Sequence, residues 1–456
     1  MAEQKTKKAL TEDRKNENQF APDRRSVGPR LLWVWVVFFA LMLSSCETII
    51  SYNLAKALPK NESISEQPVE EPPPNAQQEG SAQEAVILTD NSPASLGPVS
   101  DQNSQVPELP AGPTPGDRPV PPSVVPVSAP LAGGQRFRGK VSTFWPVHDE
   151  VRNDTFDVAT DGVSVFVADR SHHVIREITL ANHQVQVIAG KLGVSGAADG
   201  KQGQNLLNRP RGLVSAGENL YFIDQGNHTI RKIDGHSRQI TTVAGLAGAS
   251  GSTDGVGAAA RFFAPVGIAT DGAQLFVTDG NHTVRKIEIT TGLVITIAGT
   301  PNVAGYADGP GKQARFSTPS GIVAHKNDLY VADRSNHLIR KIDKSSGSVS
   351  TFAGNENGNF GENSVDGSKV QVKFFYPTGI ATNLIDLFVT DAGNHTVRQI
   401  QIASARVRTL AGSAGQKGLV DAEGSLARFN WPCGISIFEK FFFVADARNH
   451  AIRKIE

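Results

Sequence analysis

Aspartate and histidine side chains recur in register between residues 169 and 453, and both residue types can bind metal ions or transfer protons. Each copy follows an apolar run and reads approximately Asp-x-x-Asn-His-x-Ile-Arg. The aspartates are Asp169, Asp224, Asp279, Asp333, Asp391 and Asp446. The histidines are His173, His228, His282, His337, His395 and His450. A metal site is the first hypothesis that such a pattern raises.

The spacing of the copies indicates a repeat architecture. The arginines that end the copies lie 55, 54, 55, 58 and 55 residues apart, and a fixed period of this length predicts an array of similar units. Residues 265–299 lie within one period and contain four short runs rich in β-branched and aromatic residues. The runs are 266–270, 275–278, 283–287 and 293–297. Gly, Asp and Asn separate them, so we predict four antiparallel strands per unit, which is a β-propeller blade.

The two ends of the array indicate how the ring closes. The sixth copy supplies three strands, and residues 140–145 carry the apolar pattern of a fourth. We therefore predict that this N-terminal strand joins the last blade and closes the ring, which removes exposed sheet edges. The predicted fold class is all-β, a six-bladed β-propeller over residues 136–456.

This arrangement weakens the metal hypothesis. Repeats on different blades lie too far apart to share an ion whose ligand bonds are near 2 Å. We predict instead that the aspartates accept backbone N–H bonds in the turn between the second and third strands. Asn would adopt the left-handed conformation there, and His and Arg would pack or bond between blades. Neither a metal site nor a cofactor is predicted.

An Asp-Gly pair also recurs in the connections between blades. Its copies begin at Asp199, Asp254, Asp308 and Asp366, with Asp421-Ala422 as a variant. One carboxylate per loop is a poor calcium site, because calcium takes six to eight oxygen ligands. The uniform length of these connections favours a standard packing element between blades.

Function is expected where the copies differ. Arg170, Arg334 and Arg448 follow the repeated aspartates on one face, and they could offer a cationic rim to an anionic or carboxylate-bearing partner. The alternative is that they are ordinary solvated arginines. Phe360 lies in a Gly/Asn-rich loop and is a further candidate contact.

The N-terminal third differs in composition. Residues 1–30 carry eight Lys or Arg, and residues 31–43 are apolar and uncharged. This is typical of an export signal, and Leu43-Ser44-Ser45-Cys46 resembles the lipobox of bacterial lipoproteins. That resemblance implies a lipid anchor on Cys46, with an uncleaved transmembrane anchor as the alternative. Residues 47–135 hold 16 of the 26 prolines and are predicted to form a disordered linker.

Charge and cysteine content limit the functions and the covalent cross-links that this protein can have. Lys plus Arg and Asp plus Glu are equal at 45 each, so no global charge draws the chain to nucleic acid. If Cys46 carries lipid, Cys433 is the remaining cysteine of the two and no intrachain disulfide can form. The sequence shows no nucleophile–base signature and no phosphate-binding loop.

The repeated phrase, preceded by Pro-x-Gly-Ile-Ala and followed by Val-x-Thr-x-Ala-Gly, resembles the NHL repeat family over residues 140–456. The resemblance implies a six-bladed propeller used mainly to bind proteins, RNA or cell-envelope ligands, although some relatives of the fold are lyases. The first copy departs from the pattern, with Thr155-x-Asp157 in place of Pro-x-Gly.

The predicted function is a lipid-anchored, exported binding propeller at the periplasmic or extracellular face of the cell envelope. We expect it to be monomeric and to recognise a protein, peptide or cell-wall ligand through its loop face. The first alternative is a lyase or lactone hydrolase with a divalent metal in the central channel. The second is an RNA-binding propeller, which export and the neutral charge disfavour.

Overall fold

The computed structural model describes residues 137, 139–146, 155–355, 365–368 and 371–456. All of them belong to one compact unit, Ser104–Glu456, and the other unit, Met1–Asn103, lies outside the described residues. Cys46, the predicted linker and Phe360 also lie outside them. In the described part of the chain, no helix is long and apolar enough to cross a membrane.

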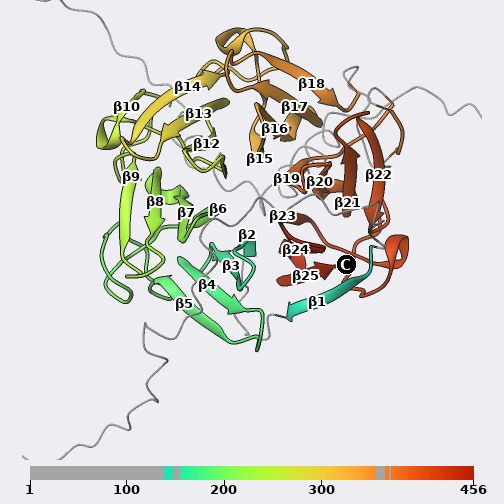
Figure 1. Ribbon diagram of the computed structural model, residues 1–456, viewed down its shortest axis with the longest axis horizontal. Coiled ribbons are helices and arrows are strands. Elements are labelled where there is room, and N and C mark those ends of the chain that lie inside the picture. Colours follow the sequence, from blue (N-terminus) through green and yellow to red (C-terminus); the bar gives the residue numbers. More distant parts are fainter. Residues whose placement is uncertain (1–136, 138, 147–154, 356–364, 369–370) are drawn as a thin grey trace, which may run out of the picture. The chain divides into compact units, whose positions relative to one another are not determined.

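Six antiparallel sheets are arranged in a ring around a central axis (Figure 1). Blade 1 consists of β2 (Thr155–Thr160), β3 (Ser164–Asp169), β4 (Val174–Thr179) and β5 (Val185–Gly190). Blade 2 consists of β6 (Pro210–Ala216), β7 (Asn219–Asp224), β8 (Thr229–Ile233) and β9 (Ile240–Ala244). Blade 3 consists of β11 (Gly267–Thr270), β12 (Gln274–Asp279), β13 (Thr283–Glu288) and β14 (Leu293–Ala298), with the short β10 (Gly255–Val256) outside.

The second half of the ring repeats the same order. Blade 4 consists of β15 (Pro319–His325), β16 (Asp328–Asp333), β17 (Leu338–Asp343) and β18 (Val349–Ala353). Blade 5 consists of β19 (Pro377–Thr382), β20 (Asp386–Asp391), β21 (Thr396–Gln401) and β22 (Arg406–Ala411). Blade 6 consists of β23 (Pro432–Phe438), β24 (Phe441–Asp446), β25 (Ala451–Ile455) and β1 (Val141–Pro146). The predicted six-bladed architecture is confirmed.

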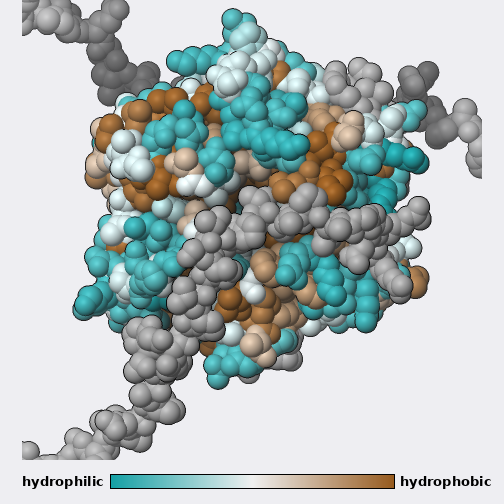
Figure 2. Space-filling model, in the orientation of Figure 1, coloured by the Kyte–Doolittle hydropathy of each residue, from teal (hydrophilic) through white to brown (hydrophobic). Residues whose placement is uncertain are grey.

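Apolar side chains from adjacent blades form the cores of the ring. The core between blades 1 and 2, for example, packs Phe166 and Ile175 against Leu213 and Phe222, and all four are buried. β-branched and aromatic residues suit these strands, because each blade is covered by a neighbour on both faces. Figure 2 shows apolar and hydrophilic areas interspersed over the face that it presents.

The predicted closure by an N-terminal strand is also confirmed. β1 pairs antiparallel with β25, from Val141 opposite Ile455 to Pro146 opposite Ala451. The connection that enters blade 6 holds the other edge of β1, where Val141 N donates to Ala422 O at 2.8 Å. The first and last parts of the propeller are therefore joined on two sides.

The inner strands of all six blades meet around the axis. Each of β2, β6, β11, β15, β19 and β23 contacts the inner strands of both neighbouring blades. The glycines of Pro-x-Gly lie at these contacts: a Cβ on Gly267 would overlap the carbonyl oxygen of Ser320, and one on Gly379 would overlap that of Cys433. At these two contacts the absence of a side chain allows the close backbone approach. Blade 1 departs from the pattern, with Asp157 at the equivalent position.

Candidate functional site

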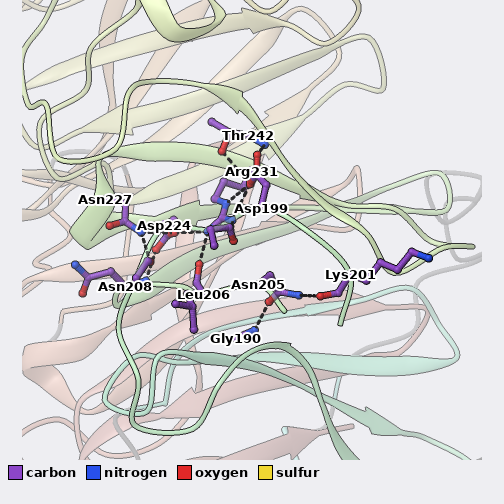
Figure 3. Close-up of polar contacts among 12 residues, drawn as sticks. Gly190, Asp199, Lys201, Asn205, Leu206, Asn208, Asp224, Asn227, Arg231 and Thr242 are labelled. Atoms are coloured by element: carbon purple, nitrogen blue, oxygen red, sulfur yellow. Dashed lines mark hydrogen bonds and ion pairs between the residues drawn. The ribbon is translucent and has the colours of Figure 1, made fainter. Parts of the chain in front are cut away.

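The repeated Asp, Asn and Arg form a buried network within the blade, which Figure 3 shows for blade 2. In blade 2, Asp224 Oδ2 accepts hydrogen bonds from Asn227 Nδ2 and Arg231 Nη1, each at 2.7 Å. Arg231 Nη2 donates to Asp199 Oδ1 in the preceding connection, also at 2.7 Å. Asp199 in turn accepts the backbone N–H of Thr242 on the outer strand at 2.8 Å. One guanidinium thus ties the turn, the connection and the outer strand together.

Blades 3 to 6 repeat this network. In each, a fully buried arginine bonds both the aspartate of its own motif and the aspartate of the connection entering its blade. The arginines are Arg285, Arg340, Arg398 and Arg453. The Asp-Gly connections therefore act as packing elements. Among the described residues, no group of three or more His, Cys, Asp or Glu side chains could hold a metal ion.

The left-handed residue of the turn is histidine, not asparagine, so the expectation for Asn is wrong. In blades 2, 4, 5 and 6 the turn is a short 3-10 helix that ends at the Asn, and the next residue, the His, has a φ of 53–60°. The Asn side chain bonds the Asp within the turn, as Asn336 does with Asp333 at 2.8 Å. The His then reverses the chain direction into the third strand.

Five of the repeated histidines link one blade to the next. The Nδ1 atom accepts a backbone N–H from the residue that precedes the blade-opening proline of the following blade, at 3.0–3.2 Å. The pairs are His173 with Arg209, His228 with Ala264, His282 with Thr318, His337 with Tyr376 and His395 with Trp431. Burial lowers the pKa of these imidazoles, to about 4 for His337 and His395. They are neutral at pH 7, with the Nδ1 lone pair available to accept.

The residues that donate to these histidines are themselves left-handed. Their φ values are 46–58°, an unfavourable conformation for bulky side chains such as Tyr376 and Trp431. The histidine bond offsets this cost and fixes the backbone beside the turn of the preceding blade. The side chains at these positions differ from blade to blade: Arg209, Ala264, Thr318, Tyr376 and Trp431.

The three arginines predicted to form a cationic rim pack against aromatic rings. Only 6% of Arg170 and 7% of Arg334 is exposed, and Arg448 is half-buried. Each guanidinium carbon lies over a ring: Arg170 over Phe156 at 5.6 Å, Arg334 over Tyr376 at 4.9 Å and Arg448 over Trp431 at 4.3 Å. Stacking removes most of the surface of Arg170 and Arg334 from water, and the role of the three arginines in ligand binding stays a prediction.

Two of these stacks lie side by side on blades 4 to 6. The ring centroids of Tyr376 and Trp431 are 6.1 Å apart, and Phe375 lies 4.8 Å from Tyr376. The three rings are half-buried, so each has one part packed and one part open to solvent. We call Arg334, Phe375, Tyr376, Trp431 and Arg448 the arginine–aromatic platform.

A cavity of about 70 Å³ lies among the inner strands at the axis. An aliphatic ring of Val158, Leu213, Ile268, Ile322, Ile380 and Ile435 lines it. Polar groups also line it, among them Asp157, Thr378 and Arg211, whose guanidinium carbon lies 4.0 Å from the Phe156 ring centroid. The space corresponds to about two water molecules. It suits the tip of a ligand better than a whole one.

Asp157 fills the place of the missing glycine. Its carboxylate accepts the N–H of Val158 at 2.9 Å and that of Leu213 in blade 2 at 3.1 Å, and it packs on Gly434 of blade 6. Burial raises the pKa of Asp157 to about 6 despite these bonds and the nearby Arg211. The departure in the first repeat thus joins three blades at the axis.

The sequence prediction included the arginines of the platform but not its aromatic residues. A signal was present, because the residue before the blade-opening proline differs in all five copies that have this proline. Its importance becomes clear only when the histidine of the preceding blade is seen to hold it.

A closed ring of six four-stranded blades, with variable residues held on one face around a narrow axis, defines a six-bladed β-propeller. The NHL repeat family matches this chain over residues 316–342, which span blade 4 from the end of its connection to its third strand. The chain therefore contains an NHL repeat and is similar to NHL-repeat proteins.

Comparison with known proteins gives relatives of the same kind. Human NHL repeat-containing protein 2 is 28% identical over 339 residues, covering 66% of this chain and 46% of that protein. Protein SUPPRESSOR OF QUENCHING 1, chloroplastic, of Arabidopsis thaliana is 28% identical over 309 residues, covering 64% and 29%. The chain thus spans less than half the length of the curated relatives that it matches.

Solved structures share the fold at low identity. A protein of unknown function from Bacteroides thetaiotaomicron superposes with a TM-score of 0.53 at 18% identity, covering 70% of this chain and 76% of that one. An auxiliary nutrient binding protein from Bacteroides ovatus gives 0.51 at 17%, covering 70% and 77%.

Proposed function

We propose that this propeller is a binding protein that holds a protein or peptide partner on the arginine–aromatic platform. The platform combines the residue types that contribute most to protein interfaces, namely Trp, Tyr and Arg. Their backbone is fixed before any partner arrives, since His337 and His395 hold Tyr376 and Trp431. A preorganised surface loses little conformational entropy on binding.

The observation that carries the proposal is the pairing of each guanidinium with an aromatic ring. Arg448 lies 4.3 Å from the Trp431 ring and Arg334 lies 4.9 Å from the Tyr376 ring. Arg448 is half-buried, and a stacked guanidinium has a defined orientation that suits pairing with a carboxylate, whereas Arg334, at 7% exposed, packs against the Tyr376 ring. We therefore expect partners that present acidic side chains next to apolar ones.

The axial cavity supports a role for the same face in recognition. Arg211 places a further guanidinium there, and Thr378 adds a hydroxyl. Its 70 Å³ volume would accept the end of one partner side chain. The partner would then rest on the platform and insert one group at the axis.

The proposal includes the location of the protein. The export signal and Cys46 would tether the chain to a membrane of the cell envelope, and residues 47–135 would hold the propeller away from it. Replacing Cys46 with Ser tests the anchor in cell fractions after labelling with a radioactive fatty acid. Continued acylation, or unchanged membrane retention, would rule out a lipid on Cys46.

The binding face can be tested by site-specific photo-crosslinking in the full chain. A benzoylphenylalanine at position 376 should capture a partner, whereas the same group at position 264 should not. Position 264 is a matched control because Ala264 has the same left-handed backbone and the same histidine bond, on blade 3.

Affinity measurements complete the test. With a peptide selected from a random displayed library, we expect Trp431→Ala and Arg448→Ala each to weaken binding by about tenfold or more, as for hot-spot residues. Selected peptides should be rich in Asp or Glu. Peptides without acidic residues that bind both variants as tightly as the wild type would contradict the proposal.

A further inference from the structure

We propose that the seam between blades 6 and 1 contains a binding site for a small amphipathic anion, an apolar chain or ring that carries a carboxylate. A cavity of about 360 Å³ lies there, within the size range of small-molecule sites. Its walls include Phe144, Leu180, Phe438, Phe441, Phe443 and Lys454. This inference does not depend on the proposed function, since these residues are separate from the platform.

The cavity exists because blade 6 breaks the repeat at its hairpin between the first two strands. The first residue of the second strand is polar in the five other blades: Ser164, Asn219, Gln274, Asp328 and Asp386. In blade 6 it is Phe441. An aromatic residue at a position that is otherwise polar has no explanation in the common architecture of the blades.

The contact made by the neighbouring residue on the third strand changes accordingly. In blade 4, Asp328 forms an ion pair with Lys341 at 2.8 Å, and in blade 5 Asp386 accepts a hydrogen bond from Gln399 at 2.6 Å. The equivalent of these partners in blade 6 is Lys454, whose Nζ lies 3.8 Å from the centroid of the Phe441 ring. In blade 6 the polar pair between the second and third strands is therefore replaced by the aromatic ring of Phe441 with the ammonium of Lys454 beside it.

The opposite wall belongs to blade 1 and to the closing strand. The Phe144 ring lies 5.0 Å from that of Phe443 and 4.9 Å from the imidazole of His183. Gly162 provides the space for Phe438, because a Cβ there would overlap the Phe438 ring. Residues from both ends of the folded chain therefore shape one apolar cavity.

Exposure shows which part of the cavity is reachable. Phe443 forms a floor that is 1% exposed, whereas Phe144, Phe438 and Phe441 are half-buried and face solvent in part. Partly exposed aromatic rings thus surround a buried one. An apolar group that enters from solvent would cover these rings, which is favourable because it removes apolar surface from water.

The charges around the cavity favour an anion. Lys454 keeps about a quarter of its side chain exposed and pairs with Glu456 at 2.9 Å. Lys440 adds a second ammonium, 5.2 Å from the Phe441 ring centroid. A ligand carboxylate could bond the ammonium of Lys454 through its remaining donors, while the apolar part of the ligand occupies the space between the rings.

The test is titration calorimetry of the full chain with decanoate below its micelle-forming concentration. We expect saturable binding of one decanoate per chain. The double variant Phe441→Asp with Lys454→Gln recreates the Asp386–Gln399 pair of blade 5, so it should fold while binding at least about tenfold more weakly. Leu426→Gln, at a side chain that is 69% exposed and does not line the cavity, should bind like the wild type.

Two further variants sharpen the outcome. Lys454→Gln alone should reduce the preference for decanoate over decanol, because it removes only the cation. Phe441→Gln uses the residue that blade 3 has at this position and replaces the double variant if that one unfolds. Absence of saturable binding to the wild type, or equal binding by a folded Phe441 variant, would overturn the proposal. Unchanged decanoate binding by Trp431→Ala would keep this site separate from the platform.

Discussion

At the scale of single residues, the repeated histidine controls the backbone of a neighbour that differs in every blade. His337 Nδ1 accepts the N–H of Tyr376 at 3.0 Å, and the neutral imidazole is required because a protonated ring would present an N–H there. The same bond occurs for five of the histidines in the described residues. We therefore expect the ring to be sensitive to acid.

The first prediction concerns that sensitivity. The folded state lowers the pKa of His337 and His395 from 6.5 to about 4, so it favours the neutral form. Their stabilising contribution is complete above about pH 6.5 and is lost progressively as the pH falls from there toward about 4. We expect the free energy of unfolding in urea to decrease over this range, and to decrease less for His337→Gln.

The exposed His236 provides the control, because it takes no part in the contacts between blades. His236→Gln should follow the pH profile of the wild type. If His337→Gln and His236→Gln have the same profile, the imidazole bond between blades does not govern the acid response.

The second prediction concerns the buried arginines. Arg340 is fully buried between Asp333 and Asp308, so Arg340→Leu leaves a buried carboxylate without its cation. We expect a loss of about 3–5 kcal/mol in the free energy of unfolding. Lys341 forms a more exposed ion pair with Asp328, and Lys341→Leu should cost about 1 kcal/mol or less. Urea unfolding of both variants at pH 7 compares them, and similar costs would contradict the prediction.

Sequence reasoning at this scale found the residues but not all of their conformations. It assigned Asp, Asn, His and Arg to the structure rather than to a metal site, yet it gave the left-handed conformation to Asn. The αL preference of Asn is a general tendency. The contact that selects His comes from the next blade, about 36 residues along the chain, so no local rule could supply it.

At the scale of elements, the strand pattern could be predicted well because it depends on local alternation. The run predicted at 283–287 is β13, Thr283–Glu288, and the run at 293–297 is β14, Leu293–Ala298. The closing strand could also be predicted, since residues 140–145 resemble the outer strands of other blades. The hydrogen bonds that hold this strand could not, because they join residues 278 positions apart.

The third prediction concerns these bonds. Thr143 donates its N–H and hydroxyl to Asp421, just as Thr242 of blade 2 donates to Asp199. Thr143→Val removes the hydroxyl hydrogen bond to Asp421. Thr143 lies on β1, which no short connection joins to the other strands of blade 6. We expect it to lower the melting temperature more than Thr242→Val does, although the lost bond is worth only about 1 kcal/mol in each case. Equal shifts in differential scanning calorimetry would contradict this.

At the scale of the whole molecule, closure joins residues that the sequence keeps far apart. The cavity at the seam between blades 6 and 1 needs Phe144 from the closing strand, Leu180 from blade 1 and Phe441 from blade 6. A reading of one repeat at a time cannot find it. The platform likewise combines distant residues, since Arg334, Tyr376 and Trp431 come from three successive blades.

The fourth prediction concerns the closure itself. A chain without residues 1–146 leaves the edge of β25 unpaired, and unpaired edges promote aggregation. We expect this truncation to melt at lower temperature and to form larger species in size-exclusion chromatography. A synthetic peptide of residues 137–146 should restore the monomer, because it supplies β1 and its contacts. A truncated chain that stays monomeric and equally stable without the peptide would contradict the prediction.

The left-handed residue before each blade-opening proline has a consequence for how this protein could diversify. A histidine on the preceding blade fixes the backbone of this residue. Its side chain is therefore not needed to shape the loop. Arg, Ala, Thr, Tyr and Trp already occupy equivalent places on one ring. Single substitutions at these positions could therefore alter the recognition surface while the backbone of the propeller stays constant.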